Sequence, residues 1–353
     1  MSEPIDQIAR QAGEWLRGEG PMHEIVISTR IRLARNIAGF FFLSRADADA
    51  RREIAETIQA AVRKAEQLKH FVHVDVDQLD ELQRNLLVER QLISRQHAEA
   101  NGARKVAFDI SEASSLMINE EDHLRIQVMR SGLQLEESWN QINEIDDLLE
   151  SQLEYAFHPQ FGYLTACPTN VGTGIRVSVM LHLPALRLTN ELERVGQAAR
   201  DMKLAVRGLF GEGTEALGDF FQISNQITLG RDEVDLIDDF RHVVIPKIVE
   251  YEQAARNALL EKRLYALDDK IFRAMGTLQS ARLISSNEAL QYLSHVRMGL
   301  HVGRIKTVDL QTVNELFMQT QPAHLQLLQG ERLTGEQRSI ARAALIRARL
   351  SHN

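Results

Sequence analysis

The 353-residue sequence contains one cysteine, Cys167, so no intrachain disulfide can form and a reducing compartment is expected. It has no apolar run close to the ~20 residues of a membrane helix, and Met1–Gly20 lacks the basic and apolar regions of a signal peptide. Basic residues are outnumbered, 41 against 49, and the net charge of −8 argues against a general nucleic-acid coat. These absences predict a soluble, cytoplasmic protein that binds neither a membrane nor nucleic acid directly.

Familiar nucleotide and metal motifs are also missing. The glycines of GTGIR, at residues 172–176, are not followed by Lys-Ser or Lys-Thr and form no P-loop, and no GxGxxG opens a helix. The HRD triplet of kinases that phosphorylate hydroxyl groups does not occur. Histidines do not combine with cysteines or acids at zinc spacing, so a structural zinc site is not expected.

The composition is that of a globular protein, 44% hydrophobic and 25% charged, and its patterns divide the chain into two parts. Strand signals end near residue 232, and almost only helical patterns follow. The helix that starts at Asn190 is expected to open with a capping box formed with Glu193. Strands are expected at residues 25–33, 105–118, 123–129, 176–183 and 220–230, and helices at residues 47–70, 139–157, 190–206, 249–267 and 336–350. We therefore predict an α+β domain at residues 1–255 and an all-α domain at residues 256–353.

Four segments place charge or glycine where a fold does not need it. They are STRIR at 28–32, NEEDHLR at 119–125, CPTNVGTGIR at 167–176 and RGLFGEG at 207–213. Taken singly, each has an ordinary structural explanation. Arg30 and Arg32 fit a solvated strand face, Glu121 a turn, and Cys167 a small buried apolar position.

Together, these segments supply two glutamates, Glu121 and Glu212, and five arginines. The arginines are Arg30, Arg32, Arg125, Arg176 and Arg207. Five guanidinium groups in one place repel one another unless a polyanion lies among them, and triphosphate is the common cellular polyanion. With Mg²⁺, such a fork stabilises phosphoryl transfer without a Walker lysine. Two carboxylates suit a guanidinium acceptor, whose nitrogen must lose a proton before it attacks.

In these segments the sequence resembles the guanidino (phosphagen) kinase superfamily, which includes creatine and arginine kinases. The whole chain is most similar to the bacterial protein-arginine kinases of the McsB type. INEEDHLRIQ, YLTACPTNVGTGIR, FQISNQITLG and ARAALIRARL carry this likeness. Phosphagen kinases have a small helical domain before the catalytic one, for which STRIR at residue 28 leaves no room. The resemblance implies a catalytic domain with an antiparallel sheet flanked by helices, followed by a helical domain for substrate recognition and dimerisation.

The resemblance also implies roles for individual residues. ATP is the implied cofactor with Mg²⁺, and the five arginines are expected to hold its phosphates. Glu121, Glu212 and Cys167 are the implied catalytic residues, and no protein side chain is assigned to the metal. The remaining ATP-binding positions are Ser28, Thr29, Ile31, Gln91, Val177, Ser178, Val179, Met180, Gly208, Leu209, Phe210 and Gly211.

The sequence departs from the family pattern in two places. Gln91 stands where relatives usually carry a histidine beside the adenine. The family motif Arg-Asp-x-x-Arg-Ala, which binds phosphoarginine, here has Ser339 in place of the aspartate. Arg338 and Arg342 still stand one helical turn apart and are candidates for an allosteric phosphoarginine site. The alternative is that they belong to a solvated basic helix.

The resulting hypothesis is an ATP-dependent kinase of protein arginines that acts in the stress response and marks proteins for degradation. The resemblance implies a homodimer, protein substrates with accessible arginines, a zinc-binding activator protein, a transcriptional repressor and a Clp-type unfoldase or protease as partners. Two alternatives are a kinase for free arginine or another small guanidine, and a non-catalytic adaptor that binds phosphoarginine proteins.

Overall fold

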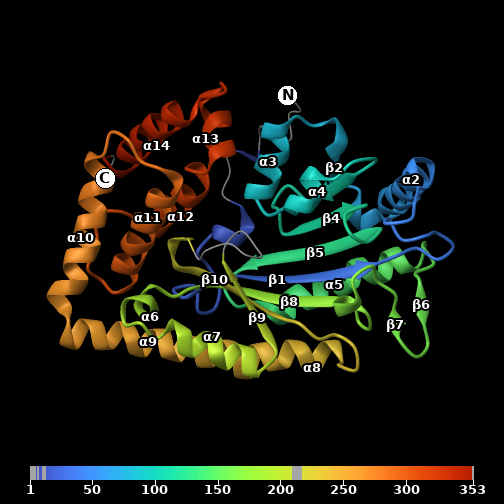
Figure 1. Ribbon diagram of the computed structural model, residues 1–353, viewed down its shortest axis with the longest axis horizontal. Coiled ribbons are helices and arrows are strands. Elements are labelled where there is room, and N and C mark those ends of the chain that lie inside the picture. The colour runs from blue at the N-terminus through green and yellow to red at the C-terminus, as the bar shows by residue number, and fades with distance from the viewer. Residues whose placement is uncertain (1–4, 6–7, 10–12, 209–216, 352–353) are drawn as a thin grey trace.

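The computed structural model describes residues 5, 8–9, 13–208 and 217–351. Glu212, Leu209, Phe210 and Gly211, which the sequence assigns to the site, lie outside these residues. An eight-stranded sheet forms the centre of the molecule, and the C-terminal helices pack against one end of it (Figure 1).

Every neighbouring pair of strands in this sheet is antiparallel, in the order β2-β3-β4-β5-β1-β8-β10-β9. Strand β1 is central because it pairs with β5 on one side and β8 on the other, while β9 forms an edge. A separate hairpin consists of β6 (Phe157–His158) and β7 (Gly162–Tyr163). The strands of the large sheet are β1 (Val26–Arg35), β2 (Val72–Asp75), β3 (Lys105–Phe108), β4 (Ser114–Ile118), β5 (Leu124–Ser131), β8 (Ile175–His182), β9 (Leu204–Gly208) and β10 (Phe220–Asn225).

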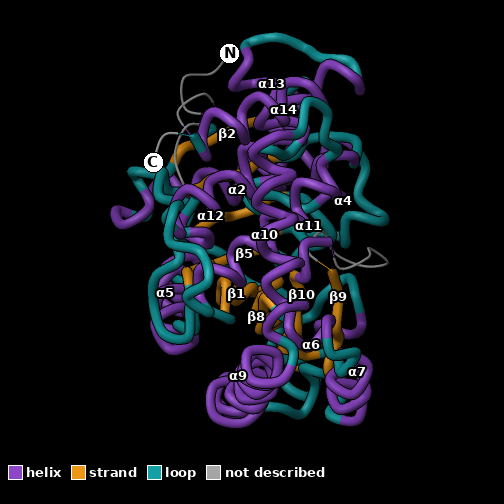
Figure 2. Tube along the Cα trace, turned by 90° about the vertical axis from the view of Figure 1, so that its left-hand side faces the viewer, coloured by secondary structure: helices purple, strands orange, loops and turns teal. Residues whose placement is uncertain are grey.

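The two faces of the sheet differ because successive side chains of a strand point to opposite sides. On β1, Ile31 is fully buried in the hydrophobic core, whereas Arg30 and Arg32 on the other face are partly exposed. Helix α5 packs on β1 and β5 at the apolar face, as Figure 2 shows from the C-terminal side. The polar face is thus free to form a site.

Helices surround the sheet and form the rest of the chain. Those before residue 263 are α2 (Ala48–Lys64), α3 (Glu81–Glu89), α4 (Arg95–Glu99), α5 (Leu135–Glu150), α6 (Pro184–Leu188), α7 (Leu192–Asp201), α8 (Glu233–Asp238) and α9 (Ile245–Lys262), with a π-helical turn at Asp239–Val244. The C-terminal group consists of α10 (Leu264–Ser280), α11 (Ser286–His301), α12 (Leu310–Gln319), α13 (Pro322–Gln329) and α14 (Gly335–Leu350). Among the described helices, none combines the length and the apolar composition that a bilayer crossing requires.

The predicted fold class is confirmed, but several predicted helix ends are wrong. The helix expected to reach residue 157 ends at Glu150, because the next residues bond to the end of β1: the amide of Ala38 donates to Glu154 O and that of Ala156 to Asn36 O. The helix expected at 47–70 gives way to a 3₁₀ turn after Lys64.

Two other predicted helices also differ from the structure. The expected capping box of Asn190 and Glu193 does not form, since α7 begins after Glu191 without a side-chain cap. It ends at Asp201, because residues 204–208 pair with β10. The helix expected at 249–267 is broken at Arg263, whose non-helical backbone separates α9 from α10.

The C-terminal helices share buried polar contacts with the first part of the chain. Glu89, the last residue of α3, accepts hydrogen bonds from the amides of Ala323 and His324 at the start of α13 (2.8 and 3.0 Å). Its carboxylate also accepts from Nδ1 of the buried His324, 2.8 Å away. The neighbouring Arg90 donates to the other ring nitrogen of His324 and pairs with the buried Glu112. The hydrophobic core likewise runs from the sheet into α10, α11 and α12.

Candidate active site

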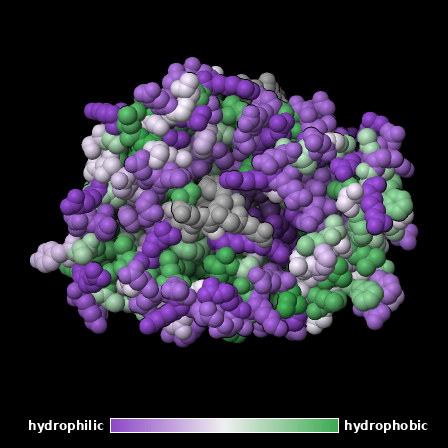
Figure 3. All heavy atoms as spheres, in the orientation of Figure 1, coloured by the Kyte–Doolittle hydropathy of each residue, from purple (hydrophilic) through white to green (hydrophobic). Residues whose placement is uncertain are grey.

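A pocket of about 720 Å³ opens over the polar face of the sheet. In Figure 3 the corresponding face has a hollow bordered by hydrophilic residues near its centre. The pocket brings together Glu121, Cys167 and four of the five predicted arginines. Its lining is Arg32, Leu33, Ala34, Gln96, Glu121, Arg125, Cys167, Thr169, Asn170, Gly174, Arg176, Arg207, Gln226 and Ile227.

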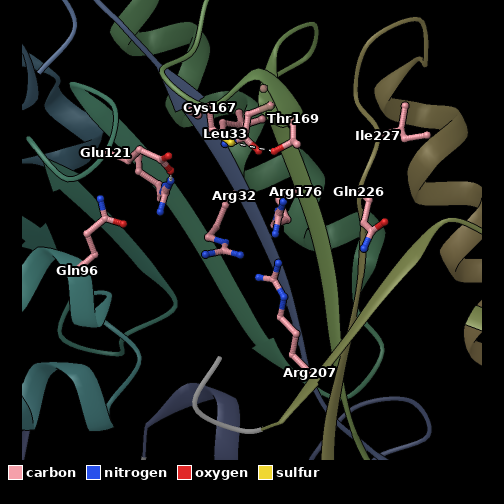
Figure 4. Close-up of a pocket in the computed structure, with 14 residues that line it drawn as sticks. Arg32, Leu33, Gln96, Glu121, Cys167, Thr169, Arg176, Arg207, Gln226 and Ile227 are labelled. Atoms are coloured by element: carbon pink, nitrogen blue, oxygen red, sulfur yellow. Dashed lines mark hydrogen bonds and ion pairs between the residues drawn. The ribbon is translucent and has the colours of Figure 1, made fainter. Parts of the chain in front are cut away.

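The arginines of the pocket come from neighbouring strands of the sheet. Arg32 of β1 lies in register opposite Arg176 of β8, and Arg207 extends from the edge strand β9. Their guanidinium groups point toward a common centre in Figure 4. Burial, together with the charges of Arg30, Arg125 and Arg176, lowers the pKa of Arg32 well below its usual value. This mutual repulsion makes the pocket a strong site for a polyanion.

Among the described residues, no partner accepts a hydrogen bond from the buried Nε of Arg32. A buried donor without a partner costs free energy, so an acceptor in the pocket would stabilise the side chain. The oxygens of a phosphate chain are acceptors of this kind. Arg32 therefore points to the nature of the ligand more directly than its neighbours do.

Arg30 lies beside this pocket rather than in it. Its guanidinium donates to the side-chain oxygens of Gln91 (3.1 Å) and Gln222 (2.5 Å), and its Nε to Ser178 (3.4 Å). Burial lowers the pKa of Arg30 to about 10, and Arg176, Arg125 and Arg207 add to this effect. The guanidinium group of Arg30 is thus held by uncharged acceptors, although the neighbouring arginines repel it.

The side chains around Arg30 include several predicted nucleotide residues. Ser28, Gln91, Ser178 and Met180 line a small hollow with a volume of about 10 Å³. Gln91 has a left-handed backbone, with φ of 64°, and its carbonyl accepts from Gln127. The side chain of Gln91, at the position where the resemblance implies a histidine, thus holds Arg30.

Glu121 enters the pocket from the turn between β4 and β5. Its carboxylate lies 3.1 Å from Arg125, and its side chain is 34% exposed, so it is accessible to a substrate. The adjacent Glu120 is buried and binds Arg125 at 2.7 Å. Burial alone would raise the pKa of Glu120, but Arg125, Ser94 and the amide of Glu121 lower it below its usual value. Glu120 therefore remains charged and fixes both the arginine and the backbone of Glu121.

Cys167 lies on the loop that precedes β8, with its Sγ 3.0 Å from the hydroxyl of Thr169. The buried Asp122 anchors this loop: one carboxylate oxygen accepts from the amide of Ala166 and from the side chain of Asn36, both at 2.7 Å. From the other side, Thr228 donates to the carbonyls of Thr169 and Val171. The loop that carries the thiol is thus fixed at two points.

Glycine is required where this loop joins β8. Gly174 has φ of 66°, and a Cβ there would lie 2.7 Å from Ala34 O and from Arg35 Nη1. Its carbonyl accepts from the amide of Ala34 on β1 (3.0 Å), while Arg35 donates to the preceding Thr173 O (3.0 Å). The loop approaches β1 too closely for any side chain.

Gly174→Ala is therefore expected to destabilise the protein more than Gly230→Ala does. Gly230 has a similar φ of 73° but open space around its Cβ, so it isolates the cost of the backbone conformation, about 1–2 kcal/mol. At Gly174 the clash adds about 2 kcal/mol more. Denaturant unfolding of both variants measures this difference, and equal losses would contradict the close approach.

The predicted residues Thr29, Ile31, Val177 and Val179 do not reach the pocket with their side chains. All four are fully buried, and the three apolar ones belong to the core on the opposite face. The hydroxyl of Thr29 instead binds Gly132 O and the amide of Gln134. Strand alternation places them on the face opposite to Arg30, Arg32, Arg176 and Ser178. Gly208, another predicted position, lies on β9 opposite Phe221.

Glu120, Asp122 and Gln222 were not singled out by the sequence patterns. The signal for the first two was present, because both flank Glu121 in a run of acids that a simple turn does not need. Gln222 alternates with buried apolar residues on β10, which marks the polar face only once the sheet order is known.

Arg338 and Arg342 lie on α14, far along the chain from the pocket. Arg342 is buried and donates to the carbonyls of Thr320 (2.7 Å) and Ile284 (3.0 Å). Burial lowers the pKa of Arg342, and the charge of Arg338, one helical turn earlier, lowers it further. Arg338 donates to Leu333 O, and Ser339 to Gly335 O within the helix.

Comparison with known proteins identifies the family of this chain. Residues 53–255 match the family model described as ATP:guanido phosphotransferase, C-terminal catalytic domain, and residues 264–353 match the protein-arginine kinase McsB C-terminal domain. A protein-arginine kinase of Halothermothrix orenii is 45% identical over 98% of this chain and 99% of its own. That of Symbiobacterium thermophilum is 46% identical over 98% of both chains. The chain belongs to the protein-arginine kinase family. The predicted family and enzyme class are thereby confirmed.

Solved structures with this fold are phosphagen kinases. The duplicated taurocyamine kinase of Schistosoma mansoni matches with a TM-score of 0.61 at 24% identity, over 70% of this chain and 35% of that one. A lombricine kinase matches with a TM-score of 0.59 at 25% identity, over 71% and 75% of the two chains. These likenesses support the antiparallel catalytic fold.

Proposed function

We propose that this protein transfers the γ-phosphoryl group of ATP to arginine side chains of proteins. The observation that carries the proposal is the pocket in which Arg32, Arg176 and Arg207 converge while Glu121 and Cys167 line its wall. The arginines supply the charge that a triphosphate requires. The acidic wall suits a guanidinium acceptor.

In the proposed reaction, the fork of arginines holds the phosphates and stabilises the charge on the transferred group. The carboxylate of Glu121 orients the substrate guanidinium and takes a proton from the attacking nitrogen. The N–P bond forms as the bond from Pγ to the bridging oxygen breaks, and ADP leaves with the electron pair. Cys167 lies beside the acceptor, and Glu120 keeps Arg125 and Glu121 in place.

Magnesium is assigned to the nucleotide rather than to the protein. Among the described residues no group of three histidine, cysteine or acidic side chains forms a metal site, and Mg²⁺ commonly binds substrate phosphates with few protein ligands. The described pocket fits this mode, because its charged side chains are four arginines and one glutamate. When bound, Mg²⁺ neutralises charge on the phosphates.

Several finer assignments are part of the same proposal. Glu212 is the second carboxylate at the acceptor, and Ser28, Gln91, Ser178 and Met180 lie near the base. Residues 1–255 form the catalytic domain and 256–353 the domain for substrate recognition and dimerisation. We place the protein in the cytoplasm, where it marks proteins for degradation under stress. The proposed partners are a zinc-binding activator, a transcriptional repressor and a Clp-type protease.

The test is phosphoarginine formation on an unfolded protein substrate incubated with ATP and Mg²⁺. Wild type is expected to form the product, and Glu121→Ala is expected to form almost none. ADP release with free arginine in place of protein distinguishes the small-guanidine alternative. Absence of product with wild type, or undiminished product with Glu121→Ala, overturns the proposal.

A second candidate function is phosphoarginine binding by the C-terminal domain. It is favoured by the placement of Arg338 and Arg342 one turn apart on α14, a spacing at which two guanidinium groups suit one phosphate. Arg342 already donates hydrogen bonds to two backbone carbonyls, which favours Arg338 as the phosphate contact.

Ser339→Asp is expected to tighten phosphoarginine binding by about tenfold, because a carboxylate beside Arg338 would pair with the ligand's guanidinium group, worth about 1.4 kcal/mol. Calorimetric titration with phosphoarginine measures the change. Ser351→Asp, an exposed serine near the end of the same chain, serves as the control and is expected to have no effect. Unchanged affinity in Ser339→Asp would favour the solvated-helix interpretation.

A further inference from the structure

A second hollow adjoins the catalytic pocket and shares two lining residues with it, Gln226 and Ile227. We call it the side groove, and its volume is about 280 Å³. The complete lining is Met202, Lys203, Leu204, Asn225, Gln226, Ile227, Leu229, Arg231, Leu236, Asp239, Phe240 and Val244. No role in the reaction proposed above accounts for it.

The side groove has an apolar surface that is unusually exposed. Met202, Ile227 and Leu229 are 49%, 42% and 52% exposed, whereas Leu236 and Phe240 form a buried floor. Its charged lining residues are Lys203 and the ion pair of Arg231 with Asp239 (2.5 Å). Exposed apolar side chains gathered around a hollow suit the binding of another apolar group.

The side groove is connected to the catalytic pocket through the segment that follows β10. Gln226 and Ile227 of this segment line both hollows, whereas the side chains of Arg207 in the pocket and Leu204 in the groove leave β9 on opposite faces of the sheet. Thr228, between the lining residues Ile227 and Leu229, also holds the loop that carries Cys167. In Figure 4, Gln226 and Ile227 stand on the side of the pocket away from Glu121.

We propose that the side groove binds an apolar side chain of the protein substrate, two or three residues from the arginine that is phosphorylated. This inference rests on the proposed function. An arginine within a polypeptide can enter the pocket only if its flanking residues leave along the pocket wall, and an extended chain covers about 10 Å in three residues. A free guanidine would not reach the groove. Continuity with the pocket therefore favours a segment of the substrate over a separate partner.

The experiment compares two peptides with one arginine each. One carries leucine at the second and third positions on both sides of the arginine, and the other carries serine there. Wild type is expected to phosphorylate the leucine peptide with a kcat/KM about tenfold higher, through KM, as a small apolar pocket discriminates. Met202→Ser/Leu229→Ser is expected to reduce this ratio below about twofold while leaving the serine peptide's kcat/KM unchanged. Val234→Ser, a matched control at a 54% exposed valine outside the groove lining, keeps the wild-type ratio.

The serine peptide separates this proposal from the function on which it rests. If wild type phosphorylates it but shows no preference for leucine, the side groove is not a subsite and the kinase assignment stands. If Met202→Ser/Leu229→Ser still prefers the leucine peptide, the proposal that the side groove is a subsite is likewise wrong. If wild type phosphorylates neither peptide, the proposed function fails and the subsite fails with it.

Discussion

Glu121→Gln is expected to lower kcat for arginine phosphorylation by about 10³-fold, within the usual 10²–10⁴-fold contribution of a general base. The amide keeps the shape of the side chain but cannot take the proton from the attacking nitrogen. Arg125 retains its 2.7 Å contact with Glu120, so the phosphate-binding arginines stay in place. The KM for ATP is therefore expected to change by less than about threefold, because binding is not the step affected. Steady-state kinetics with an unfolded protein substrate measures both constants.

The matched control for this variant is Glu136→Gln. Glu136 is an exposed carboxylate that pairs with Arg241 outside the pocket, and such surface pairs contribute little. We expect wild-type kinetics from it. If Glu121→Gln kept its kcat, or lost ATP binding as strongly as turnover, its assignment as the proton acceptor would be wrong.

Arg32→Ala is expected to have opposite effects on the empty and the nucleotide-bound protein. The lowered pKa of Arg32 means that its charged form is less favourable in the folded than in the unfolded chain, first through burial and then through the neighbouring arginines. Its removal should raise the free energy of unfolding without nucleotide by about 1 kcal/mol, a typical size for a single substitution. Differential scanning calorimetry without ATP measures this gain.

With ATP, the same variant should have a lower free energy of unfolding than wild type. Loss of a charge-assisted contact worth about 2.8 kcal/mol, near the upper end of the usual range, raises the Kd for ATP by about 100-fold. Stabilisation by nucleotide at 100 times the wild-type Kd then falls from about 2.7 to about 0.4 kcal/mol. Arg273→Ala, which removes an exposed arginine paired with Asp269 on α10, should change neither value. Equal loss of stability with and without ATP would indicate that Arg32 serves only packing.

The predicted strands agree better with the structure than the predicted helix ends, for a physical reason. β1 and β8 carry long alternating runs whose apolar side must be buried, so their positions follow from the pattern alone. The ends of α5 and α7 depend on backbone partners far away in the chain. The amide of residue 156 donates to the carbonyl of Asn36 instead of a helical carbonyl, and residues 204–208 pair with β10. A helical pattern contains no information about such partners. The break at Arg263 has no proline or glycine to announce it.

The site follows the same logic. The residue types predict a shared site for Arg32, Arg176 and Glu121, and all three line one pocket. Not every side chain of residues 28–32 and 176–180 faces the pocket, since alternation places Ile31, Val177 and Val179 in the core. The supporting residues Glu120, Asp122 and Gln222 act through contacts between strands and loops that become visible only when β1, β5, β8 and β10 lie side by side. Their positions in the site depend on how the strands pair, which a local sequence motif does not specify.

The contact between Glu89 and the first turn of α13 also bears on how this enzyme is best dissected. Glu89 is followed directly by Arg90, which touches His324, and by Gln91, which holds Arg30 beside the phosphate pocket. A fragment cut before α10 would lose α13 and with it the three donors to the carboxylate of Glu89, which lies two residues before Gln91. We therefore expect truncation to disturb the position of Arg30 as well as to remove the helices, so the roles of the two halves are better separated by point substitutions in the intact chain.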